Sequence, residues 1–143
     1  MDKSQKLVKT YLGITKGAIH TLLVMFILGM IANLYIEIPA GGNAWTWVFT
    51  HSGVIASHAV LGTLLVLVSI ASLVLAFLNH RTGWIVASAL GLIFTAGAAY
   101  FGSSFLSADS GLSSLLMAFG FLGALVSYAS AVFQTKVVGA INK

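Results

Sequence analysis

Residues 52–78 read SGVIASHAVLGTLLVLVSIASLVLAFL and contain no charged side chain. An α-helix needs about 20 predominantly apolar residues to cross the hydrocarbon core of a bilayer, so this stretch is long enough to span one. Apolar runs of similar length occur at about 17–38, 83–105 and 112–133. The sequence therefore predicts four membrane-spanning helices.

The composition of the whole chain agrees with this interpretation. Of the 143 residues, 59% are hydrophobic and 7% are charged, whereas a soluble domain carries roughly 25% charged residues. So few charges cannot cover a water-exposed surface, and we expect the outer surface to contact the lipid bilayer. The chain has no cysteine, which excludes disulfides, thiolate metal sites and thiol catalysis.

The connections between the four runs are short and rich in turn-forming residues. PAGGN (39–43) begins the first, NHRT (79–82) forms the second, and SADS (107–110) forms the third. Asp109 or Ser110 is the expected N-cap of the last helix. Short turns require successive spans to run antiparallel, so the predicted fold is all-α, an integral membrane antiparallel four-helix bundle.

Three parts of the chain follow from this division. Residues 1–16 are predicted to form a short interfacial or frayed N-terminal segment. Residues 17–135 form the four-helix transmembrane domain, and residues 136–143 form a polar tail.

All seven basic residues fall on one side of this four-span arrangement. Because cytoplasmic segments of membrane proteins are enriched in Lys and Arg, we expect both termini on the cytoplasmic side of a plasma membrane. The same rule accounts for the net charge of +4, so we expect no nucleic-acid partner. The basic residues are Lys3, Lys6, Lys9, Lys16, Arg81, Lys136 and Lys143, and the opposite side holds Glu37 and Asp109.

Each predicted span carries a row of small or polar residues at three-to-four spacing. Membrane helices bury such residues rather than purely apolar ones, so we expect the rows to meet in the bundle centre. The rows are His20, Leu23, Ile27, Met30, Asn33 and Glu37; His51, Ile55, His58, Gly62, Leu65, Ser69, Ser72 and Ala76; Gly83, Ala87, Gly91, Thr95, Ala98 and Gly102; and Ser113, Met117, Gly120, Ala124, Ser127, Ala131 and Gln134.

His58 is the strongest candidate for a functional residue, because ionisable groups inside a span are costly and commonly serve a function. Its imidazole could ligate haem iron or copper. Met117, at similar depth, could supply a thioether as the sixth ligand of a haem, and Gly62 would let a flat porphyrin approach. Met30 and Thr95 are expected in the same layer, roughly 10 Å beneath the outer surface. The alternative is a hydrogen-bonded histidine with Met117 filling space.

Other polar groups have two interpretations each. His51 is expected on the same face as His58, about 10 Å away, either holding a haem propionate or wetted at the interface. His20 could ligate an inner haem, although no second histidine is placed at its depth. Glu37 with Asn33 could form a proton or quinone site, or simply reach water. The tryptophans are expected as interface anchors, with those of the first connection in a loop and Trp84 near the inner boundary.

Four segments carry a resemblance to known proteins: NLYIEIP (33–39), HSGVIASHAVLGTLL (51–65), YFGSSFL (100–106) and SSLLMAFGF (113–121). They resemble a group of small four-span bacterial and archaeal membrane proteins, which implies the topology alone. More distantly, HAVLGTLL followed by GLIFTAGAAYFG is similar to half of a haem A synthase or a b-type membrane cytochrome. Such units pair histidines from two helices. The third and fourth spans contain no histidine here, so the resemblance implies Met117 or an open second position.

Three hypotheses on function remain open. The first is a b-type haem protein for electron transfer or redox sensing, with His58 as main ligand and a redox partner. The second is a non-catalytic accessory subunit or assembly factor that binds other membrane subunits. The third is a copper or other metal site built from His51, His58 and methionines. No catalytic motif is present, so we lean against an enzyme. A homo-oligomer is compatible with the small-residue rows.

Overall fold

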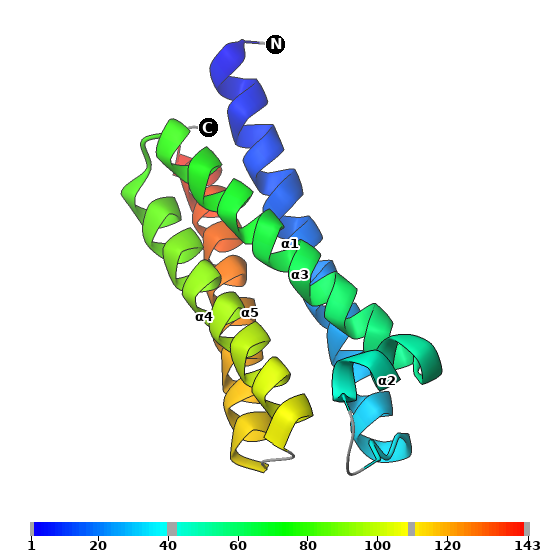
Figure 1. Cartoon of the computed structure of the whole chain (residues 1–143). Coiled ribbons are helices and arrows are strands. Elements are labelled where there is room, and N and C mark those ends of the chain that lie inside the picture. The colour runs from blue at the N-terminus through cyan, green and yellow to red at the C-terminus, as the bar shows by residue number, and fades with distance from the viewer. Residues whose placement is uncertain (1, 40–42, 109–110, 142–143) are drawn as a thin grey trace.

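The computed structural model describes residues 2–39, 43–108 and 111–141, with side chains up to 107 and from 111 to 135 within these ranges. The helices are α1 (Lys3–Tyr35), α2 (Ala44–His51), α3 (Gly53–Leu78), α4 (Thr82–Ala108) and α5 (Gly111–Ile141) (Figure 1). The predicted all-α bundle is confirmed. By length and composition α1, α3, α4 and α5 can each cross a bilayer, so this is a multi-pass membrane protein.

The first helix begins much earlier than the sequence predicted. The Asp2 side chain accepts a hydrogen bond from the Lys3 backbone N–H and caps α1 at its start. The helix then continues without a break to Tyr35, and both Tyr11 and Thr15 are completely buried. Residues 3–16 are therefore a continuation of α1 rather than a frayed segment, and α1 packs against the other helices from about Tyr11 onward.

The first connection contains a helix that the sequence did not predict. The Asn43 side chain accepts from the Thr46 N–H and caps α2, which carries the tryptophans expected in a loop. Ser52 ends α2 in an extended conformation (φ −127°, ψ 92°), and its side chain accepts from the Ile55 N–H to start α3. His51 and His58 therefore lie on separate helices, and the row predicted from His51 along a single helix is wrong at this point.

The second connection forms the tight turn that was predicted. α3 ends at Leu78, Asn79 donates from its side chain to the Leu75 carbonyl at 2.7 Å, and α4 begins at Thr82. His80 has a positive φ of 52°, which allows the chain to reverse within these few residues. The N-cap predicted at Asp109 or Ser110 lies outside the described residues.

The four long helices form a ring in which α1 contacts α3 and α5, and α4 contacts α3 and α5. The pairs α1–α4 and α3–α5 are diagonal, with no close backbone approach among the described residues. The closest pair is α4–α5, where small residues face one another: a Cβ at Gly120 would lie 2.9 Å from both the Ala98 Cβ and the Phe94 carbonyl oxygen. Close backbone contact through small residues is the usual packing mode in membranes.

The buried face of α1 differs from the predicted row. Tyr11, Thr15, Ala18 and Leu22 face the other helices. The predicted row placed small and polar groups inside, but Leu23, Ile27 and Met30 of that row are 47%, 58% and 43% exposed. The rows on the other spans are largely confirmed; their buried members are Ile55, Leu65, Ser69, Ser72, Ala76, Ala87, Gly91, Thr95, Gly120, Ala124, Ser127 and Ala131.

The two core clusters lie in one half of the bundle, whereas the buried side chains described in the other half are those of Val48, Ser52 and Ile55 around the α2–α3 junction. We call the end with the N-terminus and the α3–α4 turn the basic end, and the other the α2 end. Toward the α2 end the α1–α3 and α4–α5 pairs diverge (Figure 1). In that half no described side chain is fully buried at 23–35 of α1, 56–64 of α3, 96–107 of α4 or 111–119 of α5. These four stretches are called the open half below.

Candidate functional site

His58 lies in the open half, within two turns of the start of α3, and its imidazole packs against α1. A Cβ at Gly29 would come within 3.3 Å of His58 Cε1, so this glycine makes room for the ring. Nδ1 is buried and has no hydrogen-bond partner among the described residues. The Met25 carbonyl lies near the imidazole without completing a hydrogen bond to Nδ1. A buried polar atom without a partner is costly, so this nitrogen marks a candidate site.

Met117 lies at the level of His58 but on the diagonally opposite helix. The Ser69–Tyr128 hydrogen bond joins α3 to α5. His58 precedes Ser69 on α3 by the same number of residues as Met117 precedes Tyr128 on α5, so the two side chains lie at the same level. Met117 packs on α4, where a Cβ at Gly102 would lie 3.1 Å from its Sδ. The structure thus brings the two predicted ligands to one level of the open half, each packed on a different neighbouring helix.

Of the other two members predicted for this layer, Met30 follows Gly29 and so lies at the level of His58, whereas Thr95 lies at another level. Met30 points away from the bundle. Thr95 is buried closer to the basic end, beside Tyr128, and its Oγ1 has no hydrogen-bond partner among the described residues. Thr95 lies opposite Ala124 rather than opposite Met117, because Gly91 meets Tyr128 and Gly102 meets Met117. Of the four residues predicted for this layer, only His58 and Met117 therefore lie at one level and pack against neighbouring helices.

The remaining histidines in the predicted sites face outward. His51 is exposed at the end of α2, where its ring stacks on Trp47 and its Nδ1 lies 2.6 Å from the Thr50 hydroxyl. His20 is exposed on α1, and its Nδ1 donates to the Lys16 carbonyl at 2.7 Å. Local partners thus orient both rings, and neither shares a hydrogen bond or ring contact with His58.

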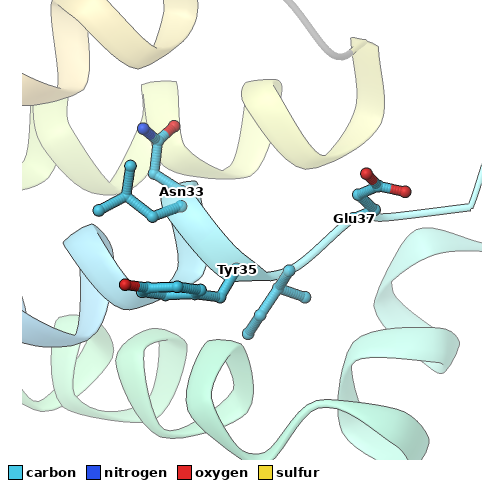
Figure 2. A pocket seen from close by; sticks show the side chains of 5 residues that line it. Asn33, Tyr35 and Glu37 are labelled. Atoms are coloured by element: carbon cyan, nitrogen blue, oxygen red, sulfur yellow. The ribbon is translucent and has the colours of Figure 1, made fainter.

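A shallow pocket at the α2 end is lined by residues 33–37 (Figure 2). Asn33 and Glu37 extend to one side of the chain there and Tyr35 to the other. All three side chains are exposed. A glutamate at this position reaches solvent directly. This favours the prediction that Glu37 simply reaches water over the prediction of a proton or quinone site.

Sequence reasoning missed a network of buried hydroxyl groups in the half near the basic end. The Tyr11 hydroxyl shares a hydrogen bond with Ser88 Oγ (3.1 Å), which is 3.2 Å from Ser72 Oγ. Ser72 is in turn 3.5 Å from Thr15 Oγ1, and all these side chains are completely buried. The network joins α1, α3 and α4 through polar contacts where lipid offers none.

Tyr128 makes the corresponding link across the other diagonal. Its hydroxyl donates to Ser69 Oγ at 2.6 Å, and its ring lies against Gly91, where a Cβ would approach within 2.6 Å. At the basic end the Tyr11 ring stacks on Trp84 (4.4 Å between centroids), which is buried and is not the interface anchor predicted. The regular spacing of Tyr11, Thr15, Ala18 and Leu22 is the sequence signal that would have indicated this face.

Replacing Tyr128 by phenylalanine should destabilise the bundle by about 1 kcal/mol, because the buried Ser69 hydroxyl loses its donor while the ring still fills its space. The midpoint of unfolding in a mixed-micelle SDS titration would measure this. Tyr100→Phe, at an exposed position of α4, is the matched control and should leave the midpoint unchanged. Equal midpoints for both variants would contradict a stabilising Tyr128–Ser69 bond.

Comparison with protein-family models, curated proteins and solved structures gave no match. Among the described residues no group of three or more His, Asp or Glu side chains could hold a metal ion. The site must therefore be argued from His58, Met117 and their surroundings.

Proposed function

We propose that this protein binds one b-type haem in the open half of its bundle, with His58 as an axial ligand, and serves in electron transfer or redox sensing. The observation that carries the proposal is the unpartnered, buried Nδ1 of His58 in the half of the bundle that lacks a packed core. A haem in this half would cover side chains that the bundle leaves unburied, and binding at Nε2 would leave the proton on Nδ1 to be donated to a nearby acceptor.

The chemistry of His58 suits ligation to iron. With Nε2 bound to a metal, a neutral imidazole carries its proton on Nδ1, and ligating histidines usually donate that proton to a nearby acceptor. The Met25 carbonyl beside the ring is available for this role after a small adjustment. A haem would supply the reversible one-electron change, and the chain would supply orientation and an apolar surrounding.

The surroundings of His58 can yield to a flat ligand. Gly29 lies against the imidazole, and Gly62, one turn along α3, is covered only by the flexible Met25 side chain, whose Cε would lie 3.2 Å from a Cβ there. Met117 at the same level is equally adaptable and could supply the second axial ligand. Methionine side chains rearrange at small cost, so the open half can admit a porphyrin without disturbing the buried hydroxyl network.

The test is the absorption spectrum of the purified protein after incubation with haemin. We expect a Soret band that shifts on reduction with dithionite and that His58→Ala abolishes. His20→Ala and His51→Ala are matched controls that should keep the band, because both side chains are exposed. Met117→Leu should retain haem but alter the reduced spectrum. A band that persists in His58→Ala, or no band in the wild-type protein, would overturn the proposal.

The second candidate function is that of a non-catalytic subunit of a larger membrane complex. The divergence of the two helix pairs also supports this function. A partner helix, rather than a cofactor, would then fill the open half. A photo-cross-linking residue at Tyr100 in this half should capture a specific membrane protein, whereas one at Val74, which is exposed near the basic end, should not. Capture together with a colourless protein would favour this candidate over haem binding.

A further inference from the structure

The face of α1 that points away from the bundle carries a row of basic residues and glycines. Lys9, Gly13, Lys16, Gly17 and His20 are all exposed, and their spacing places them on one side of the helix, opposite Tyr11 and Thr15. We call these five residues the basic stripe. The basic stripe lies outside the open half and does not include His58, so it is separate from the haem proposal.

The basic stripe lies at a depth along the bundle where charged groups are unusual. Thr15, next to Lys16, meets Ser72 on α3, and α3 continues beyond Ser72 through the apolar residues LVLAFL (73–78). Phe77 and Leu78 at the end of this stretch are themselves largely exposed. Lys16 and His20 therefore flank a part of the bundle whose neighbouring surface is apolar. An ammonium group at this level is costly unless it reaches or pairs with an anion.

The described part of the chain offers no such anion. Its carboxylates are Asp2, which caps the start of α1, and Glu37, which follows the other end of α1. No described carboxylate forms an ion pair with Lys9 or Lys16. A negative partner for the stripe must therefore come from outside the described chain.

The surface between the lysines is open. A Cβ at Gly13 or Gly17 would meet no atom within 4 Å, so a ligand can approach the helix backbone at both positions. Gly13 lies between Lys9 and Lys16 along this face, and Gly17 directly follows Lys16; we call this open surface the depression. The bond from His20 Nδ1 to the Lys16 carbonyl holds the imidazole against the helix, with Nε2 left for another partner.

We infer that the basic stripe binds the phosphate headgroup of an anionic phospholipid. Lys9 and Lys16 supply the charge, and the two glycines admit the headgroup close to the helix. The same face continues toward the α2 end as exposed Val24 and Ile27, an apolar track that acyl chains can follow. A second copy of the chain fits less well, because packing two stripes together would bring the lysines of both copies into repulsion.

The test compares lipid binding by the full-length protein in delipidated detergent micelles, using native mass spectrometry. Phosphatidylglycerol should bind at least about tenfold more tightly than phosphatidylcholine. Lys9→Gln/Lys16→Gln should remove most of this preference. Gly17→Leu should weaken phosphatidylglycerol binding at constant charge, because the leucine fills the depression. Gly97→Leu, at another glycine with open space around it, and Lys3→Gln are the controls and should retain the preference.

Three outcomes would overturn the inference. Equal binding of the two lipids by the wild-type protein would show that the protein does not distinguish lipids by headgroup charge. Full competition by inorganic phosphate at concentrations similar to the lipid would indicate a plain anion site. A cross-linked dimer formed through cysteines introduced at Gly13 and Gly17, in equal yield with and without phosphatidylglycerol, would assign the stripe to a second copy. Melting curves of every variant would confirm that each remains folded.

Discussion

Gly120→Leu is expected to lower the free energy of unfolding by about 3 kcal/mol or to prevent folding. A Cβ at this position would lie 2.9 Å from the Phe94 carbonyl oxygen and 3.0 Å from the Ala98 backbone nitrogen. These are backbone atoms, so they cannot move aside by a rotamer change. The α4–α5 pair must separate, and that separation weakens the contacts that bring Tyr128 to Ser69.

The measurement is an SDS or thermal unfolding curve in the same detergent for wild-type and variant protein. Gly97→Leu is the matched control, since a Cβ there meets no atom within 4 Å and leucine favours the helix more than glycine does. It should leave the stability unchanged or slightly increased. If Gly120→Leu unfolded at the same midpoint as Gly97→Leu, α4 and α5 would not pack as closely as described here.

Tyr11→Ala is expected to cost about 3 kcal/mol, because it removes a fully buried ring and leaves a cavity against Trp84. Tyr11→Phe should cost only about 1 kcal/mol, since the stacked ring is retained and only the hydrogen bond to Ser88 is lost. Comparing the unfolding free energies of these two variants separates the contribution of ring packing from that of the hydroxyl hydrogen bond of Tyr11.

The same unfolding measurement applies, with Tyr35→Ala as control because that ring is 79% exposed. A cost for Tyr11→Ala no greater than that for Tyr35→Ala would mean that α1 does not pack against the other helices at Tyr11. This prediction therefore also tests the main correction to the sequence-based description, the continuous α1 helix.

The candidate site could be anticipated only in part. His58 and Met117 were predicted because an ionisable residue and a thioether inside apolar spans are conspicuous, and both lie at one level of the open half. His51 was placed wrongly relative to His58, because the helix breaks at Ser52, whose side chain caps α3. The haem itself remains a prediction that the absorption spectrum will decide.

The number of long apolar helices was determined by sequence alone, because the length of an apolar run measures directly whether a helix can cross a bilayer. Their limits were not, since α1 begins at Lys3 and α5 continues to Ile141. The buried faces of α3, α4 and α5 were also readable, since each has only one continuous row of small residues. On α1 two rows compete, and the tertiary structure selects the one with Tyr11 and Thr15. In lipid, burying apolar area against another helix gains little over leaving it in contact with acyl chains, so it does not decide which of the two α1 rows faces inward. The choice therefore rests on shape and hydroxyl partners, such as Ser72, Trp84 and Ser88, which only the folded bundle brings together.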